Sequence, residues 1–360
     1  MRIFGREYSR KALQGYTGIM AQLGGIRPFE LSAGRERGVR GFELTTGTGF
    51  AFTVLADRAL DITRASFRGR SLVYLAPAGE VHPAYYEPQG IGWLRTFPAG
   101  LLTTCGLSSL GSPTTDDGEE LGLHGRISNL PMEELGYWGE WVGDEYLLHI
   151  TGSLREGVVF GNPLRLTRHI TSKLGSNSLL IEDTVENIGG QPTPHMMLYH
   201  CNFGFPLLAP SSELVTTSRR VTPRDEEAAS GLAVYNHFQP PTPGYAEQVF
   251  YHDMVSDNEG NVRMALINPE LDGRLGCYLC YRQQQLPRFI QWKMMGHGSY
   301  ALGLEPANCY VEGRAKERES GTLLLLQPGE IISYHLEIGV LDGREEIENY
   351  TQAMRQNAGL

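Results

Sequence analysis

The segment Pro194-His195-Met196-Met197-Leu198-Tyr199-His200-Cys201-Asn202-Phe203-Gly204-Phe205-Pro206-Leu207-Leu208 decides the interpretation of this chain. Its apolar residues predict a buried strand that carries polar side chains. In an extended strand His200 and Asn202 point to one face, whereas His195 points to the other because its separation from His200 is odd. A buried polar group without a partner costs about 1–3 kcal/mol, so the segment predicts a polar site on one face.

Two other segments carry residues suited to the same site, namely Gly122-Leu123-His124-Gly125-Arg126 and Leu302-Gly303-Leu304-Glu305-Pro306-Ala307-Asn308. Glycines beside His124 allow the backbone to approach a ligand closely. Burial of Glu305 would raise its pKa and make it a better base near neutral pH. Two histidines and a glutamate suffice for acid–base work on a neutral substrate. The structural alternatives are a core histidine at 200, a turn histidine at 124 and an ion pair at 305.

Composition and pattern predict an all-β protein. The 360 residues include 44 glycines and 20 prolines, which separate short runs rich in β-forming residues. We predict strands over 50–55, 70–74, 145–150, 164–170, 178–185, 277–282, 323–326 and 331–338. Long alternating helices are missing, which disfavours a doubly wound α/β fold.

The expected fold class is therefore a large antiparallel β-sandwich with a few short helices. We expect a single domain over residues 1–360, with an N-terminal extension over about 1–24. Short helices are predicted over 6–13 and over 344–356, the second with Asp342 as its possible cap.

Charge and cysteine usage limit the possible partners. The net charge of -10 and the lack of a basic run weigh against nucleic acid. The sequence has no apolar run near the roughly 20 residues needed to span a bilayer, and its first ten residues do not resemble a signal peptide. The five cysteines suit reduced thiols, with Cys277 and Cys280 on opposite faces of a strand. We expect a cytoplasmic monomer or homodimer without a nucleic-acid or membrane partner.

Three short strings add candidates for ligand contact: Asp57-Arg58-Ala59-Leu60-Asp61, Trp93-Leu94-Arg95 and Gln291-Trp292-Lys293. The last two place an indole beside a hydrogen-bonding side chain, a combination that suits a carbohydrate subsite. The first is equally a turn salt bridge, and the other two are equally ordinary residues of a β core or edge.

The order of these segments resembles that of the galactose mutarotase (aldose 1-epimerase) superfamily, and more closely its uncharacterised aldose-epimerase-like branch (DUF4432-type). The strings that carry the resemblance run from near the N-terminus to beyond residue 305: Ala56-Asp57-Arg58-Ala59-Leu60-Asp61-Ile62, Gly100-Leu101-Leu102-Thr103-Thr104-Cys105-Gly106-Leu107, Leu123-His124-Gly125-Arg126, Tyr199-His200-Cys201-Asn202-Phe203-Gly204 and Gly303-Leu304-Glu305-Pro306.

The resemblance implies a β-sandwich with a sugar-binding cleft on a concave sheet, and a reaction without a cofactor. Glu305 would remove the proton of the anomeric hydroxyl, His200 would protonate the ring oxygen, and His124 would hydrogen-bond to the sugar. The chain departs from the family pattern at two places. Only Cys201 separates His200 from Asn202, and Arg126 follows Gly125 where mutarotases have a second glycine.

We expect four basic residues, Arg58, Arg95, Arg126 and Lys293, to line the cleft and to favour an acidic or otherwise polar-substituted sugar. The predicted catalytic residues are Glu305 and His200. The predicted substrate-binding residues are His124, Arg126, Asn202, Arg58, Asp61, Arg95, Trp93, Gln291 and Lys293.

Three other functions stay open from the sequence. The same sandwich could bind a carbohydrate without converting it. A metal-dependent sugar isomerase could use His124, His195, His200 and Glu305 as ligands, although their spacing does not form a compact His-x-His motif. The same acid–base pair could also serve a lyase or another epimerase. We expect no metal and no cofactor.

Overall fold

The computed structural model describes residues 1–358, and antiparallel sheets dominate it. The largest sheet has eight strands in the spatial order β11 (Glu134–Val142), β12 (Glu145–Glu156), β13 (Leu164–Lys173), β14 (Ser178–Asn187), β24 (Ile331–Asp342), β20 (Leu275–Arg282), β19 (Asn261–Asn268) and β16 (Glu213–Thr216).

Two further sheets complete the sandwich. One has the order β17 (Ser218–Pro223), β18 (Gln248–Met254), β21 (Arg288–Gly296), β22 (Ser299–Ala307), β15 (Thr193–Gly204) and β23 (Leu324–Leu326), and β8 (Thr103–Leu107) also pairs with β15. The other has the order β3 (Gly25–Glu30), β4 (Arg40–Thr45), β5 (Phe50–Leu55), β6 (Asp61–Phe67) and β7 (Arg70–Ser71).

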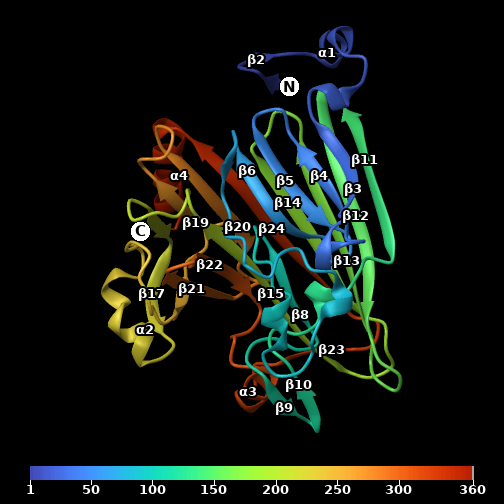
Figure 1. The fold of residues 1–360 in the computed structure, drawn as a ribbon, viewed down its shortest axis with the longest axis vertical. Helices are drawn as coiled ribbons and strands as arrows, with labels where there is room; N and C mark the ends of the chain where they lie inside the picture. The colour runs from blue at the N-terminus through green and yellow to red at the C-terminus, as the bar shows by residue number, and fades with distance from the viewer. Residues whose placement is uncertain (359–360) are drawn as a thin grey trace.

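Short elements lie at the ends of the sandwich (Figure 1). The hairpin of β1 (Arg2–Ile3) and β2 (Arg6–Glu7) lies with α1 (Arg10–Tyr16) at the top of the view. The hairpin of β9 (Thr114–Asp116) and β10 (Glu119–Leu121) lies at the opposite end with α3 (Arg314–Glu319). The remaining helices are α2 (Glu226–Ser230) and α4 (Arg344–Asn357). Among residues 1–358, no helix combines the length and the apolar character that crossing a bilayer requires.

The three sheets share one hydrophobic core, which confirms the predicted sandwich. Phe52 of β5, Ile181 of β14 and Tyr199 of β15 belong to the same buried cluster. The eight-stranded sheet therefore packs against both smaller sheets, and the apolar face of each is removed from water.

Strand β15 divides two environments by the alternation of its side chains. Tyr199 and Phe203 point into the core between the sheets, whereas Met196 and Leu198 join a separate cluster on the outer face. His195 lies on the core side, where Nε2 is 2.7 Å from the Tyr334 hydroxyl and Nδ1 is 3.2 Å from the Leu107 carbonyl. The prediction that His195 and His200 occupy opposite faces is thus confirmed.

Most predicted strands are present, and the differences have local causes. The strand predicted over 70–74 is limited to Arg70–Ser71, because Val73 bridges to Phe203 instead. The first helix begins at Arg10 rather than at residue 6, since Arg6–Glu7 pairs with Arg2–Ile3 and the Ser9 hydroxyl caps the helix. The last helix begins at Arg344, with Gly343 rather than Asp342 at its N-cap.

A buried ionic network joins the sheets behind β15. The Arg168 guanidinium, fully buried on β13, donates to the Asp183 carboxylate at 2.7 and 2.9 Å and lies 3.2 Å from Asp61. The Tyr199 hydroxyl donates to Asp183 at 2.7 Å. Removing one member of such a network leaves an uncompensated buried charge, which costs more than the pairing itself contributes.

We expect the Arg168→Met variant to lose about 3–5 kcal/mol of unfolding free energy, because Asp183 and Asp61 would keep their burial without the cation. Urea denaturation followed by circular dichroism measures this loss. The matched control is Arg165→Met on the same strand, whose exposed side chain should matter by less than about 0.5 kcal/mol. Equal effects of both substitutions would contradict the role of the network.

Candidate active site

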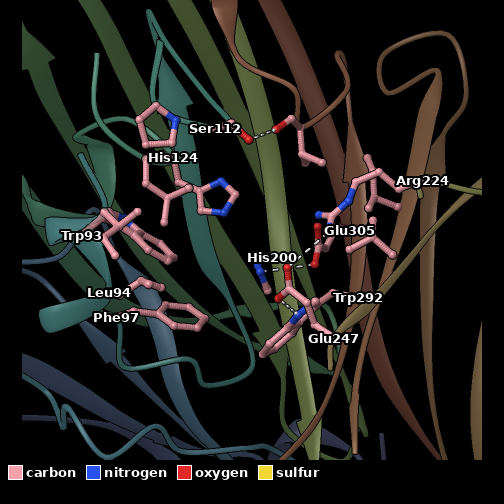
Figure 2. A pocket seen from close by; sticks show the side chains of 16 residues that line it. Trp93, Leu94, Phe97, Ser112, His124, His200, Arg224, Glu247, Trp292 and Glu305 are labelled. Atoms are coloured by element: carbon pink, nitrogen blue, oxygen red, sulfur yellow. Dashed lines mark hydrogen bonds and ion pairs between the residues drawn. The ribbon is translucent and has the colours of Figure 1, made fainter. Parts of the chain in front are cut away.

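A cavity of about 340 Å³ opens on the outer face of the sheet that contains β15 (Figure 2). Figure 2 shows Trp93, Phe97 and His124 on one side of it and Arg224 and Glu305 on the other, with His200 between them. The lining residues come from β15, β18, β21, β22 and several loops: Ile91, Trp93, Leu94, Phe97, Ser112, Pro113, Leu123, His124, His200, Arg224, Glu247, Val249, Ile290, Trp292, Glu305 and Val311.

Strand register brings His200 and Glu305 together. Leu198 pairs with Ala307 and Cys201 pairs with Leu304, so His200 lies opposite Glu305 on neighbouring antiparallel strands. Directly opposite side chains point to the same face of a sheet. His200 Nε2 consequently lies 3.2 Å from Glu305 Oε1, and both side chains are more than nine-tenths buried.

Gly303 leaves the space that this pair occupies. It pairs with Asn202 on one side and with Trp292 on the other. A Cβ atom at Gly303 would lie 2.4 Å from Glu305 Oε1 and 3.2 Å from His200 Cε1. A side chain there would displace the carboxylate, so only glycine at position 303 allows Glu305 to lie this close to the backbone of its own strand.

His124 closes the cavity from a loop. Its backbone has a φ of 56°, a left-handed conformation, and the next residue, Gly125, has a φ of 75° and packs so closely on the Gly106 carbonyl that a Cβ atom would lie 2.3 Å from that oxygen. The His124 ring lies 4.8 Å from the Trp93 ring and 6.0 Å from the His200 ring, measured between centroids. Two imidazoles and one carboxylate therefore meet around one space.

Burial controls the charge of all three groups. Burial lowers the pKa of His124 to about 4, and burial together with the nearby His124 lowers the pKa of His200 to about 3. Burial raises the pKa of Glu305 to about 8, with a further contribution from Glu247. Near neutral pH Glu305 is therefore protonated and His200 is an uncharged imidazole, so both groups are neutral and the carboxyl group carries the one acidic proton of the pair.

Three buried polar atoms of this site lack a hydrogen-bond partner among the described residues. His200 and Glu305 are at contact distance but are not aligned for a direct hydrogen bond, and within residues 1–358 Glu305 Oε1, His200 Nδ1 and His124 Nδ1 have no hydrogen-bond partner. Buried polar atoms without partners are uncommon in folded proteins and suggest that a ligand or water completes the site.

An aromatic wall lies opposite Glu305. The rings of Trp93 and Phe97 stack with centroids 4.4 Å apart, and Trp93 Nε1 donates to the Ser128 hydroxyl at 3.1 Å. Arg58 is buried behind this wall and donates to the carbonyls of Val81 and Thr96, each at 2.8 Å. Arg58 thus fixes the backbone next to Phe97 without touching the cavity.

A charged group stands at the rim. Arg224 directly follows β17, and its Nη2 lies 3.3 Å from Glu247 Oε1. Glu247 also accepts a 2.8 Å hydrogen bond from Trp292 Nε1. The sequence analysis missed Arg224 and Glu247, because each lies in a short connection whose composition gives no sign of a site.

Comparison with known proteins agrees with this architecture. The model of a domain of unknown function, DUF4432, matches residues 36–340. The chain belongs to this family. By sequence, no curated protein matches it.

Solved structures extend the likeness to the fold. A protein from Klebsiella pneumoniae subsp. pneumoniae described as a "putative aldose 1-epimerase" matches with a TM-score of 0.88 and 25% identity, covering 93% of this chain and 88% of its own. A galactose mutarotase-like protein of Clostridium acetobutylicum matches with a TM-score of 0.60 and 11% identity over 90% and 100% of the two chains. Galactose 1-epimerase of Lactobacillus acidophilus matches with a TM-score of 0.57 and 11% identity, covering 89% of this chain and 99% of its own. The resemblance to the galactose mutarotase superfamily is therefore confirmed at the level of fold.

In this DUF4432 protein the cavity unites four of the predicted site residues, His124, His200, Glu305 and Trp93. Asn202 follows His200 by two residues on β15 and is fully buried. Its side-chain amide donates a hydrogen bond to the His200 carbonyl at 2.8 Å. Asn202 therefore supports the strand next to the cavity instead of lining it.

The expected lining by four basic residues is not met. Within residues 1–358, the cavity lining contains none of Arg58, Arg95, Arg126 and Lys293. Arg58 is behind the wall, Arg95 pairs with Glu87 at 3.1 Å on the surface, and Arg126 lines a different hollow beside Glu156.

Strand alternation explains the placement of Lys293 and Gln291. Both are adjacent to Trp292, so their side chains leave the opposite face of β21. The Lys293 ammonium donates to the carbonyls of Val234 and His237 at 2.8 and 2.7 Å, and the Gln291 amide donates to the Tyr235 carbonyl at 2.7 Å. Asp61 also lies away from the cavity, in the network with Arg168.

The ligand set of the metal-dependent alternative is not brought together. His195 is held on the core side of β15, away from His124, His200 and Glu305. Within the described part of the chain, no three His, Cys, Asp or Glu side chains are grouped so as to hold a metal ion.

The raised pKa of Glu305 links this site to stability. The folded pKa of about 8 exceeds the usual 4.5, so the native state binds this proton more tightly, and the resulting stabilisation is lost as the pH rises through 8. We expect the unfolding free energy of the wild type to fall, relative to that of Glu305→Gln, by roughly 2–5 kcal/mol between pH 5 and pH 9. Chemical denaturation across this range measures it, and a difference that does not change with pH would contradict the buried acid.

Proposed function

We propose that this protein is an aldose 1-epimerase-like enzyme, which interconverts the anomers of a free sugar by acid–base chemistry. The observation that carries the proposal is the placement of His200 and Glu305, 3.2 Å apart and buried in one cavity with His124. Ring opening at the anomeric carbon needs one group that accepts a proton and one that donates a proton.

The size and walls of the cavity support a sugar substrate. Its volume of about 340 Å³ suits one small molecule. Trp93, Phe97 and Trp292 contribute aromatic surface, which suits the C–H faces of a pyranose. The Klebsiella protein, similar over most of both chains, is described as a "putative aldose 1-epimerase", which agrees with this assignment.

The proposed reaction moves two protons and opens one ring. Glu305 accepts the proton of the anomeric hydroxyl while the C1–O5 bond breaks, C1 becomes an aldehyde carbon, and His200 donates a proton to O5. Rotation about the C1–C2 bond presents the other face of the aldehyde. Reversal of both proton transfers closes the ring as the other anomer, and the enzyme returns to its starting state.

The single shared proton fits this cycle. Transfer of that proton from Glu305 to His200 through a bound hydroxyl group gives a carboxylate beside an imidazolium without changing the total number of protons, and the pKa values of about 8 and about 3 make this reactive form the minor one. In this form Glu305 can accept and His200 can donate. His124, neutral because burial lowers its pKa to about 4, is available to hydrogen-bond to the sugar.

We expect Glu305→Gln to lower kcat for anomerisation by about 10²–10⁴-fold with a small change in KM, because the base is removed while the shape is kept. NMR line exchange between the anomers of a panel of sugars measures this rate. The matched control, Glu213→Gln at an exposed position of β16, should retain wild-type activity. A sugar that binds without faster interconversion than in buffer would instead favour a carbohydrate-binding protein.

The shared proton also predicts the pH dependence of the reaction. Loss of this proton near pH 8 leaves no donor, so kcat/KM should be level between about pH 5 and 7 and should fall roughly tenfold per pH unit above 8. The enzymatic rate after subtraction of spontaneous mutarotation gives the profile. A rate that keeps rising through pH 9 would show that the singly protonated pair is not the active form.

A further inference from the structure

A pair of histidines lies on the face of the eight-stranded sheet that points away from the core. On β12 the side chains of Leu148 and Ile150 enter the core between the sheets, so His149 between them points to the other face. His169 on β13 lies on the same face as His149, because its cross-strand partner is Thr151, two residues after His149. The cavity opens on a different sheet, so this pair plays no part in the proposed reaction.

The two imidazole rings direct one nitrogen each toward a common point. His149 Nδ1 lies 3.0 Å from His169 Nε2, and the Thr171 hydroxyl lies 3.4 Å from both nitrogens. Two nitrogens that bind one metal ion at about 2.0–2.1 Å, at right angles to each other, lie about 2.9 Å apart. The separation of the two nitrogens therefore suits ligands in adjacent positions around a single ion.

The other nitrogen of each ring faces a carboxylate. His149 Nε2 lies 3.5 Å from Glu140 Oε1, and His169 Nδ1 lies 4.0 Å from Glu182 Oε2. Trp138 Nε1 donates a 3.0 Å hydrogen bond to the same oxygen of Glu140 and so holds this carboxylate in place. Histidines that bind a metal ion commonly donate their second N–H to a carboxylate, which fixes the tautomer and the orientation of the ring.

Neither tautomer of the uncharged pair suits both carboxylates. If His149 donates to His169, its Nε2 carries no hydrogen and turns a lone pair toward Glu140; if His169 donates, its Nδ1 turns a lone pair toward Glu182. Within residues 1–358, His149 Nε2 is a buried atom without a hydrogen-bond partner, and the residue is 7% exposed. A cation between the facing nitrogens removes this conflict, because both outer nitrogens then carry a hydrogen that points toward a carboxylate.

The surroundings of the pair favour a metal ion over an extra proton as this cation. Burial and the neighbouring His169 lower the pKa of His149, which disfavours a charged imidazole at this position near neutral pH. A metal ion binds imidazole in its uncharged form and is not opposed by that shift. The His169 side chain is 34% exposed, which gives an ion and its bound water access from solvent.

We propose that His149 and His169 bind one divalent transition-metal ion of the kind that prefers imidazole ligands, Zn²⁺, Ni²⁺ or Cu²⁺. Glu140 and Glu182 orient the two ligands and offset the charge of the ion. Within the described residues no third His, Cys, Asp or Glu side chain joins the group, so water and the Thr171 hydroxyl complete the coordination. The ion therefore exchanges more readily than one in a closed site of four protein ligands, and it links β12 to β13.

Isothermal titration calorimetry with ZnCl₂ tests the site on protein without an affinity tag. We expect the wild type to bind one Zn²⁺ with saturation. Glu140→Gln keeps both ligands but loses the orienting carboxylate and should weaken the binding by about 10–100-fold. His169→Gln removes a ligand and should weaken it further. The matched control is His297→Gln, in the exposed turn between β21 and β22, which should bind as the wild type does.

Two results of this titration would overturn the proposal. One is a wild type without saturable Zn²⁺ binding, and the other is binding that His169→Gln leaves unchanged, as an adventitious ion elsewhere on the surface would give. If the wild type binds no Zn²⁺ and its Trp138 fluorescence follows a protonation that His169→Gln removes, the pair holds an extra proton in place of the metal. Circular dichroism verifies that each variant is folded.

Electron paramagnetic resonance of the Cu²⁺ complex gives a readout that does not depend on any variant. We expect hyperfine coupling from two imidazole nitrogens in the wild type at one equivalent of Cu²⁺. Coupling from one nitrogen or from none would contradict the site.

Discussion

The register between β15 and β22 is the constraint on which the site depends. Because Leu198 pairs with Ala307 and Cys201 with Leu304, His200 faces Glu305 across one inter-strand spacing. A slip by one residue would send the carboxylate into the apolar core between the sheets. Phe203 and Leu302 pair at the same time and both point into that core, so the hydrophobic packing that stabilises the sandwich also fixes the distance between His200 and Glu305.

The same alternation separates the side chains that line the cavity from those that support the framework across the whole sheet. On β15, His200 faces the cavity while Tyr199 reaches Asp183 in the buried ionic network. On β21, Trp292 lines the cavity while Lys293 secures the carbonyls of a loop on the opposite side. Each strand thus contributes to the site through every second residue and to the framework through the others, which keeps the cavity-lining groups on rigid backbone.

The sequence was sufficient for the fold class, because periodicity marks strands. It also singled out His124, His200 and Glu305, which line one cavity, because buried polar residues in apolar segments are costly. The sequence was insufficient to predict which basic residues line the cavity, and the expectation that Lys293 and Arg95 do so was wrong. Proximity in sequence to Trp292 and Trp93 was taken as proximity in space, but neighbouring residues of a strand diverge, and Arg95 lies exposed beside Glu87. Arg224 and Glu247 could not be found, since their meeting depends on the pairing of β17, β18 and β21 and not on any local pattern.

The placement of the charges bears on how the cavity can act on a neutral molecule. Burial alone would leave Glu305 protonated and His200 neutral, and a strong unpaired cation nearby would pull the proton from Glu305 permanently. Arg224 is the candidate for that cation, yet Asp225 and Glu247 compensate it at the rim. The compensation leaves the pKa of Glu305 raised, because Glu247 adds to the effect of burial and offsets the opposite effect of Arg224. An anionic group in the cavity would add negative charge beside Glu305 and Glu247, and the protonated, neutral form of Glu305 therefore depends on the same charge arrangement that compensates Arg224.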